Sequence, residues 1–392
     1  MLLEAKIAAL VFAGVMSCQS VAALSAPPVP AETAAAETVA VETVAVETLE
    51  TQAPTEPAVA LEPLELYQEW LPLSCTSIFA HEDMGLVQID KVPGHENFPH
   101  TFVAYLPPYY DPYETYDLLI FLGPYDGKQG DCVDKYQSTW YTEIFRFRTV
   151  FDHLIHGKKV KPFIMIQPDY LEWKDLELTH EAIAKNIKEE LLPYLAENYA
   201  IYAEDGSYES LVAARDHVAM GGCSMGGMFT LGGLMPYCAD VASSFCPMSC
   251  NFNMSGVQQQ VESMLDQYPL NKLVYVAGGI EEKKMQTTGE HLKAALEDVL
   301  TDENYFYLEM KGTHHHYSTW AAGLWDAIQI MFREDIPLAD MVTFTPRETD
   351  EAYMAGHPER ERREEEKKRE AEKKRKEEEL KKQQQQQATE TP

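Results

Sequence analysis

The feature that most constrains the fold is the pentapeptide Gly222-Cys223-Ser224-Met225-Gly226. It directly follows residues 217–220, which have the composition of a buried strand, and directly precedes residues 227–234, a small-residue helical stretch. A serine in so tight a turn needs glycine two residues before and two after, because the two backbones close on each other. The pattern predicts that the turn exposes the Ser224 hydroxyl at the end of a sheet. The alternative is a structural glycine-rich turn with a hydrogen-bonded serine.

The middle of the chain alternates between buried strands and amphipathic helices. The predicted strands are residues 118–122, 163–166, 217–220, 273–277 and 305–310, and the predicted helices are residues 181–199, 291–300 and 321–332. This alternation predicts an α/β fold, a doubly wound, mostly parallel sheet with helices on both faces that binds ligands at the carboxyl ends of its strands. We assign residues 64–346 to this one domain.

A base must accept the proton of a serine before its oxygen becomes a good nucleophile, and in this architecture an acid and then a histidine follow the serine along the chain. Glu281 and Glu282 follow the predicted strand 273–277, and His314 and His315 follow the predicted strand 305–310. One glutamate and one histidine are therefore the predicted acid and base. The alternative for the glutamates is a solvated acidic turn.

The remaining expectations for the site concern the oxyanion and metals. Met225 begins the predicted helix, so its backbone N–H is the expected oxyanion donor. The residues 314–316 are all histidines, but neighbours on an extended segment point alternately and cannot all face one ion. We expect no metal site and no cofactor.

The N-terminus has the pattern of an export signal. Residues 7–16 are apolar, too short to cross a bilayer of about 30 Å but of the length of a signal-peptide core. Val15-Met16-Ser17-Cys18 resembles the cleavage box of bacterial lipoproteins, in which the cysteine is lipidated. We predict a signal peptide over residues 1–23 with a lipid anchor at Cys18. Cleavage near Ala22-Ala23, or a buried N-terminal helix, is the alternative.

Two further segments differ in composition from the domain. Residues 24–63 repeat Ala, Glu, Thr and Val around prolines without large aromatic residues, which predicts a disordered linker. Residues 347–392 form a tail dominated by Glu, Lys, Arg and Gln, with i,i+4 charge pairs typical of an isolated, solvated helix.

Charge excludes some partners. The chain of 392 residues has 63 acidic and 32 basic residues and a net charge of −31, so we expect no nucleic-acid partner. Any membrane contact is expected only through the N-terminal lipid. Seven cysteines are present; if Cys18 is lipidated six remain, and export would permit disulfides whose pairing nothing fixes.

Several segments together resemble a known family. They are Tyr105-Leu106-Pro107-Pro108 with Tyr110-Asp111-Pro112, residues 157–168, Arg215-Asp216-His217, residues 221–227, Pro247-Met248-Ser249, Trp320 and Gly323-Leu324-Trp325. In this order the chain is similar to the esterase D branch of the α/β-hydrolases, and most of all to bacterial feruloyl esterase modules. The resemblance implies ester hydrolysis through an acyl-Ser224 intermediate without a cofactor.

The chain departs from the family pattern around the expected site. The family strand that ends in His-Gly is here Leu122-Gly123-Pro124, and proline has no N–H, so Tyr125 or a neighbour is the expected second oxyanion donor. The family acid is Asp in a Gly-x-x-Asp turn, a spacing that Glu281 and Glu282 both meet, from Gly278 and Gly279 respectively.

The family histidine stands two residues after a glycine and five before a tryptophan. His314 meets the first condition and His315 the second, and His315 is preferred because Tyr317 also aligns. The loop at residues 250–253 replaces the Gly-Asp that the family often has, and it is expected to face the substrate.

The sequence therefore predicts an exported serine esterase that hydrolyses feruloyl- or acetyl-type esters of carbohydrates or small acyl esters. The alternatives are a surface binding protein that kept the hydrolase fold and lost turnover, motivated by Pro124, and an acyltransferase that uses the same residues.

Overall fold

The computed structural model describes residues 60–67, 71, 83–97, 99–125, 147–278, 282–311, 313, 315–334, 369, 375 and 376. All of them lie in one compact unit of the chain, Ala60–Pro392. The predicted signal peptide with Cys18, most of the predicted linker and nearly all of the tail lie outside the described residues, as do His314 and Glu281. In the part of the chain that is described, no helix is long and apolar enough to cross a membrane.

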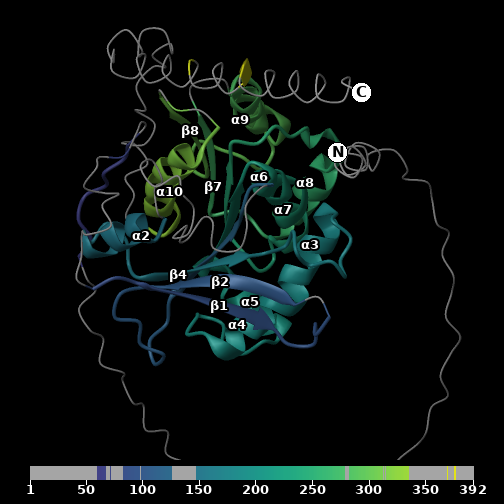
Figure 1. Ribbon diagram of the computed structural model, residues 1–392. Helices are drawn as coiled ribbons and strands as arrows, with labels where there is room; N and C mark the ends of the chain where they lie inside the picture. Colours follow the sequence, from purple (N-terminus) through teal and green to yellow (C-terminus); the bar gives the residue numbers. More distant parts are fainter. Residues whose placement is uncertain are drawn as a thin grey trace, which may run out of the picture. The chain divides into compact units, whose positions relative to one another are not determined.

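An eight-stranded mixed sheet forms the centre of the described unit (Figure 1). The strands are β1 (Leu86–Val92), β2 (His100–Leu106), β3 (Asp117–Leu122), β4 (Phe163–Pro168), β5 (Val218–Cys223), β6 (Ser244–Met248), β7 (Lys272–Gly278) and β8 (Tyr305–Met310). Their order across the sheet is β1-β2-β4-β3-β5-β6-β7-β8. β2 pairs antiparallel with β1 and β4, and the strands from β4 to β8 are parallel.

Helices cover both faces of this sheet (Figure 1). They are α2 (Phe147–His156), α3 (His180–Asn186), α4 (Leu192–Asn198), α5 (Tyr208–Ala213), α6 (Met225–Phe229), α7 (Met235–Cys238), α8 (Gln258–Gln267), α9 (Lys283–Ala295) and α10 (Tyr317–Met331), with π-helical turns η2 (Ile187–Leu191) and η4 (Thr230–Leu234) and 3₁₀ turns η3 (Arg215–His217) and η5 (Met254–Gly256).

The side chains of each strand alternate between two hydrophobic cores. In β3, Leu118, Ile120 and Leu122 face the core that also holds residues of α3, α4, α8 and α9, whereas Leu119 and Phe121 face the core that holds α2 and α10. Both faces of a parallel sheet must be covered in this way, which explains why its strands are almost continuously apolar. The predicted doubly wound α/β fold is confirmed.

The five predicted strands are present with boundaries close to those predicted, and the predicted helix 181–199 is continuous through α3, η2 and α4. The predicted boundaries 291–300 are wrong, because α9 runs from Lys283 to Ala295. Leu296 and Leu300 are buried in the same core as Leu292, but they belong to the turn after the helix. The apolar spacing therefore marked a buried face and not the length of the helix.

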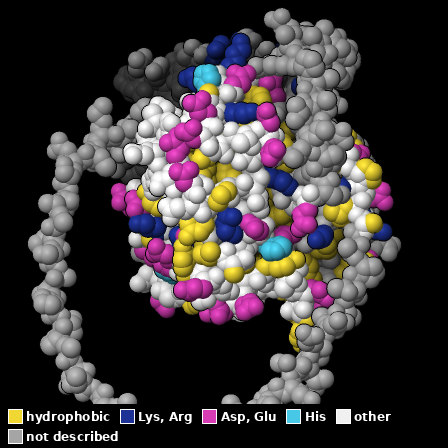
Figure 2. Space-filling view, turned by 180° about the vertical axis from the view of Figure 1, so that it is seen from behind, with side chains coloured by type: hydrophobic (Ala, Val, Ile, Leu, Met, Phe, Trp, Pro, Cys, Tyr) yellow, Lys and Arg dark blue, Asp and Glu magenta, His cyan; other side chains and the backbone are white. Residues whose placement is uncertain are grey.

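The last residues of the predicted linker lie along the α/β domain. The Glu62 N–H donates to Lys158 O at 2.9 Å, Arg333 Nη1 donates to Glu62 O at 2.6 Å, and Lys159 Nζ donates to Pro63 O at 3.0 Å. Residues before the predicted domain boundary at residue 64 thus contact the domain. On the face of the molecule in Figure 2, acidic side chains are mixed with basic and apolar ones over the described surface.

The glycines that flank the turn after β5 are required by close backbone contacts. A Cβ on Gly222 would lie 2.6 Å from Gly226 C, and one on Gly226 would lie 2.1 Å from Leu122 O at the end of β3. Neither neighbour can move without displacing the sheet, since both are backbone atoms. The spacing of the two glycines therefore follows from the packing of α6 against the end of β3.

We expect Gly226→Ala to lower the free energy of unfolding by about 3 kcal/mol or more, at the upper end of what overpacking costs. Chemical denaturation monitored by circular dichroism measures this. Gly256→Ala is the matched control, because a Cβ there meets no atom within 4 Å. Equal stability of the two variants would contradict the close packing of this turn.

Candidate active site

Ser224 occupies a strained turn between β5 and α6. Its φ of 56° and ψ of −115° lie where a residue with a side chain is rarely found, at a cost of about 1–3 kcal/mol. The Ser224 N–H donates to Met248 O at 2.9 Å, and Ser224 O accepts from Met228 N at 3.2 Å. The turn is thus held from β6 and from α6, and it leaves the side chain half-buried at the carboxyl end of the sheet.

His315 lies in the loop between β8 and α10 and reaches Ser224. Its Nε2 is 2.9 Å from Ser224 Oγ. The Trp320 ring packs edge-on against the imidazole, with centroids 5.4 Å apart and planes at 88°. The histidine side chain is 40% exposed, so solvent and a small ligand can reach the pair.

Glu282 holds the other side of His315 from a buried position. Its Oε1 lies 2.7 Å from His315 Nδ1, and the side chain is 1% exposed. Its Oε2 accepts a hydrogen bond from the Gly278 N–H at the end of β7, and Gln286 Nε2 donates to Gly278 O at 2.8 Å. Since an ionised carboxylate only accepts, His315 Nδ1 carries the proton and Nε2 is left to accept from the Ser224 hydroxyl.

Of the residues predicted for this site, the structure brings Ser224, His315 and Glu282 together in one hydrogen-bonded chain. Glu281 and His314, their predicted alternatives, lie outside the described residues. We expected no metal site at residues 314–316. Both ring nitrogens of His315 are within hydrogen-bond distance of protein atoms, Nε2 of Ser224 Oγ and Nδ1 of Glu282 Oε1.

The two predicted oxyanion donors lie at the same end of the sheet. Met225 is the first residue of α6, and the N–H groups of a first helical turn have no partner within the helix. Tyr125 follows β3, next to β5 in the sheet, and its side chain is 57% exposed. The Gly123 carbonyl before it accepts from Tyr170 Oη at 2.8 Å, which fixes the start of that loop. Their roles as donors stay predictions.

Sequence reasoning missed the backbone groups that orient the site. Gly278 N–H and Met248 O carry no sequence signal, because any residue supplies a backbone N–H or carbonyl. Ser249 belongs to a segment of the family resemblance, but its backbone strain was not predicted: it has a φ of 47° and is completely buried directly after β6. Only the pairing of β6 with β5 on one side and β7 on the other places these groups beside the serine.

Cysteine is not a competing nucleophile among the described residues. Cys223, Cys238, Cys246 and Cys250 are all buried. Burial raises the pKa of the Cys250 thiol to about 12, so it stays protonated at neutral pH.

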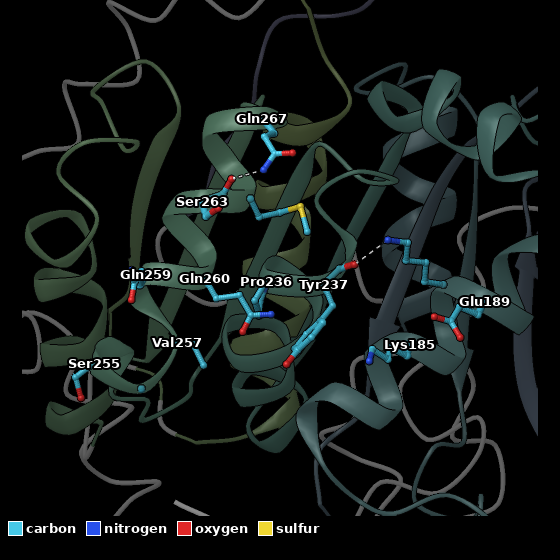
Figure 3. Close-up of a pocket in the computed structure, with 13 residues that line it drawn as sticks. Lys185, Glu189, Pro236, Tyr237, Ser255, Val257, Gln259, Gln260, Ser263 and Gln267 are labelled. Carbon is cyan, nitrogen blue, oxygen red and sulfur yellow. Dashed lines mark hydrogen bonds between the residues drawn. The ribbon is translucent and has the colours of Figure 1, made fainter. Parts of the chain in front are cut away.

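Two cavities lie among the helices of the described domain. One of about 390 Å³ lies between the loop that follows β6, including Asn251 and Phe252, and α9, including Lys284 and Thr288. The other, of about 650 Å³, is an open groove among α3, α7 and α8, lined by Lys185, Tyr237 and glutamines such as Gln260 (Figure 3). The catalytic candidates line neither cavity.

Glu282→Gln tests the orienting carboxylate. The two carboxylate oxygens accept separately from His315 Nδ1–H and Gly278 N–H, and an amide places an NH₂ donor at one of these positions. An NH₂ group facing Nδ1 favours the tautomer in which Nε2 carries the proton and cannot accept from serine. Replacing the acid of a serine triad with an amide lowers kcat by about 10⁴-fold, and we expect the same loss here. Steady-state kinetics measures this, with Glu290→Gln on α9 as the control. A loss below tenfold would contradict the assignment.

The comparisons with known proteins agree with this architecture. No model of a known protein family matches the chain. The endo-1,4-beta-xylanase Y of Acetivibrio thermocellus is 23% identical over an alignment of 245 residues that covers 59% of this chain and 22% of the xylanase. The chain thus corresponds to under a quarter of that relative's length.

Solved structures match over most of the chain. The feruloyl esterase module from Clostridium thermocellum, in complex with sinapinate, has a TM-score of 0.57 and 20% identity, over 70% of this chain and 97% of that one. A CE1 ferulic acid esterase from Anaeromyces mucronatus, in complex with ferulic acid, has a TM-score of 0.52 and 13% identity, over 68% and 97%. The protein described here therefore has the α/β-hydrolase fold that the feruloyl esterases share.

Proposed function

We propose that the protein is a serine carboxylic-ester hydrolase that acts on feruloyl- or acetyl-type esters of carbohydrates. One observation carries this proposal: the hydrogen-bonded chain from Ser224 Oγ through His315 to the buried Glu282, with heavy-atom distances of 2.9 and 2.7 Å. A serine that only stabilises a turn needs neither an imidazole nor a carboxylate behind that imidazole.

In the proposed reaction His315 Nε2 accepts the Ser224 proton while Oγ attacks the ester carbonyl. Glu282 stabilises the imidazolium that forms, and the Met225 N–H, with a second donor near Tyr125, stabilises the oxyanion. His315 then protonates the leaving alcohol. Water, deprotonated by the same histidine, attacks the acyl-serine and releases the acid, and the proton returns to Ser224.

The comparisons support the substrate class. The structures of the two similar esterases hold sinapinate and ferulic acid, and the sequence relative is a xylanase. A phenolic acyl group esterified to a plant polysaccharide fits all three.

A panel of methyl ferulate, methyl acetate, acetylated xylan and 4-nitrophenyl acetate tests this proposal. We expect kcat/KM for methyl ferulate to exceed that for methyl acetate by at least about tenfold, because one buried aromatic contact contributes more than 1.4 kcal/mol. Preference for a short acyl group would shift the proposal to acetyl esters, and turnover of none of these substrates would refute it. Product analysis with an added sugar alcohol separates hydrolysis from acyl transfer.

We also propose that the protein is exported and lipid-anchored at Cys18, with residues 24–63 as a tether. Metabolic labelling with an alkyne fatty acid in a bacterial host tests the anchor. The expected result is labelling of the full chain and its loss in Cys18→Ala. Labelling that survives this substitution, or labelling of neither protein, would refute the anchor.

A further inference from the structure

Two histidines and two carboxylates meet at a place remote from Ser224 along the chain. His95 follows the turn at Gly94 between β1 and β2, and His100 begins β2. Asp175 belongs to the segment between β4 and α3, and Glu190 belongs to η2. One ligand atom each of His95, His100 and Glu190 lies within 4.8 Å of the other two.

Asp175 fixes the tautomer of both histidines. Its Oδ2 lies 3.0 Å from His95 Nδ1, and its Oδ1 lies 2.7 Å from His100 Nε2. Because a carboxylate accepts, each of these ring nitrogens carries a proton. Such a carboxylate behind each imidazole is the usual arrangement behind metal-binding histidines, since it orients the ring and makes the opposite nitrogen a better donor to the ion.

The opposite nitrogens both turn toward Glu190. His95 Nε2 lies 2.6 Å from Glu190 Oε2, and His100 Nδ1 lies 3.9 Å from the same oxygen. His100 is completely buried, and its Nδ1 has no hydrogen-bond partner. A buried nitrogen with a free lone pair costs free energy unless something supplies a positive partner. An ion bound to Glu190 would be that partner.

We propose that His95, His100 and Glu190 form a binding site for a divalent transition-metal cation such as Zn²⁺, with Asp175 as the residue that orients both histidines. Two imidazole nitrogens and one carboxylate oxygen are a common zinc ligand set, with water in the fourth position. Without an ion, His95 has a carboxylate at each ring nitrogen and donates to both, so a bound cation would replace its Nε2 proton. The charge then fits, because two carboxylates and two neutral imidazoles carry a net charge of −2.

Metal binding requires a defined rearrangement of the partly exposed ligands. Zinc at about 2.1 Å from each donor separates tetrahedral ligands by about 3.4 Å. Glu190 Oε2 must therefore move away from His95 Nε2 and toward His100 Nδ1. The His95 and His100 rings are stacked, with centroids 3.5 Å apart, so His95 must also tilt. His95 and Glu190 are 17% and 41% exposed and can move.

His100, by contrast, is the fixed member of the site. It is buried, and it stacks on Trp173 with centroids 4.6 Å apart. Glu190 comes from η2, and π-helical turns inside helices recur at functional sites because they redirect a side chain. The ion would join the β1–β2 hairpin to the segment after β4 and to η2, so its expected role is to stabilise this edge of the domain.

The site is separate from the candidate active site, although both lie at the same end of the sheet. β2 pairs antiparallel with β4, with Phe102 opposite Pro168, so His100 lies at the carboxyl end of β4. β2 is three positions from β5 in the strand order, which corresponds to about 14 Å at about 4.8 Å per strand.

Titration of the untagged, full-length, EDTA-treated protein with ZnCl₂ by isothermal calorimetry tests the proposal. We expect one high-affinity equivalent and a rise of the thermal unfolding midpoint with zinc concentration. Glu190→Gln and His95→Gln should each weaken this binding by at least about a hundredfold. Asp175→Asn, which removes only the orienting acceptor, should weaken it by about 10–100-fold.

His217→Gln is the matched control, because His217 also stacks on an aromatic ring and pairs with one carboxylate, Asp117, but has no second one. His315→Gln, the second control, should also keep the zinc equivalent. Unfolding of each variant without zinc separates lost binding from lost folding. Failure of the wild type to bind zinc at millimolar concentration, or unchanged affinity in Glu190→Gln and His95→Gln, would overturn the proposal. The cluster would then be a protonated histidine bridging two carboxylates.

Discussion

Replacing Ser224 with alanine is expected to lower kcat for 4-nitrophenyl acetate hydrolysis by about 10⁶-fold, the loss typical when the nucleophile of a serine hydrolase is removed. The reason is that no acyl intermediate can form, since the alanine has no oxygen beside His315 Nε2. Stopped assays over hours measure the residual rate. The far-ultraviolet circular dichroism spectrum should not change, because removal of the hydroxyl leaves both backbone hydrogen bonds of the turn in place.

Ser255→Ala is the matched control for this experiment. Ser255 is an exposed serine next to α8 that lines both cavities but lies outside the proposed triad. It should retain activity within about twofold of the wild type. Retained turnover in Ser224→Ala would contradict the proposed nucleophile even if the fold were intact.

His315→Gln is expected to lower kcat nearly as far as Ser224→Ala, because base and nucleophile act as one unit. The glutamine amide can hydrogen-bond to Glu282 and fill the space, but it cannot accept and return a proton at neutral pH. Double replacement of Ser224 and His315 should therefore cost little more than either single replacement. Initial rates for the three variants measure this non-additivity.

The neighbouring histidines supply the controls. His314→Gln and His316→Gln make the same substitution at the positions directly before and after His315. Both variants are expected to retain most of the activity. A large loss in His314→Gln with little loss in His315→Gln would reverse the assignment. Comparable losses in all three variants would indicate that the loop and not one imidazole is critical.

Much of the fold and of the candidate active site could be predicted, because local sequence patterns specify them. Gly222 and Gly226 cannot carry a side chain, because a Cβ on either would lie less than 3 Å from backbone atoms. Such a constraint can be recognised in a sequence as glycine at a fixed spacing. The buried parallel strands were equally clear, because both of their faces are covered and their residues are almost uniformly apolar.

Two of the three strands that were not predicted, β1 and β6, follow another pattern. β1 lies at the edge of the sheet and exposes Leu86 and Ile89 at 57% and 68%, so it shows no buried run. β6 contains Pro247, which sequence reasoning associates with edges and loops. Each of these strands is fixed by pairing with a neighbour, and a single sequence does not reveal pairing.

The choice between Glu281 and Glu282 also required the fold. Both fit the spacing from a glycine, and both follow the same strand. Glu282 is the residue that the structure buries and binds to Gly278 N–H and His315 Nδ1. The proposed metal ligands carried even less signal, since His95 and Glu190 belong to separate elements and the fold alone brings them together.

The most direct test of the central claim is labelling of the purified protein with a fluorophosphonate probe, followed by peptide mass spectrometry. Such a probe reacts with a serine only when an adjacent base has made its oxygen nucleophilic. We predict stoichiometric modification of Ser224 in the wild type, and loss of that modification in His315→Gln. A folded wild-type protein that remains unlabelled, or labelling of Ser224 that does not depend on His315, would contradict the account.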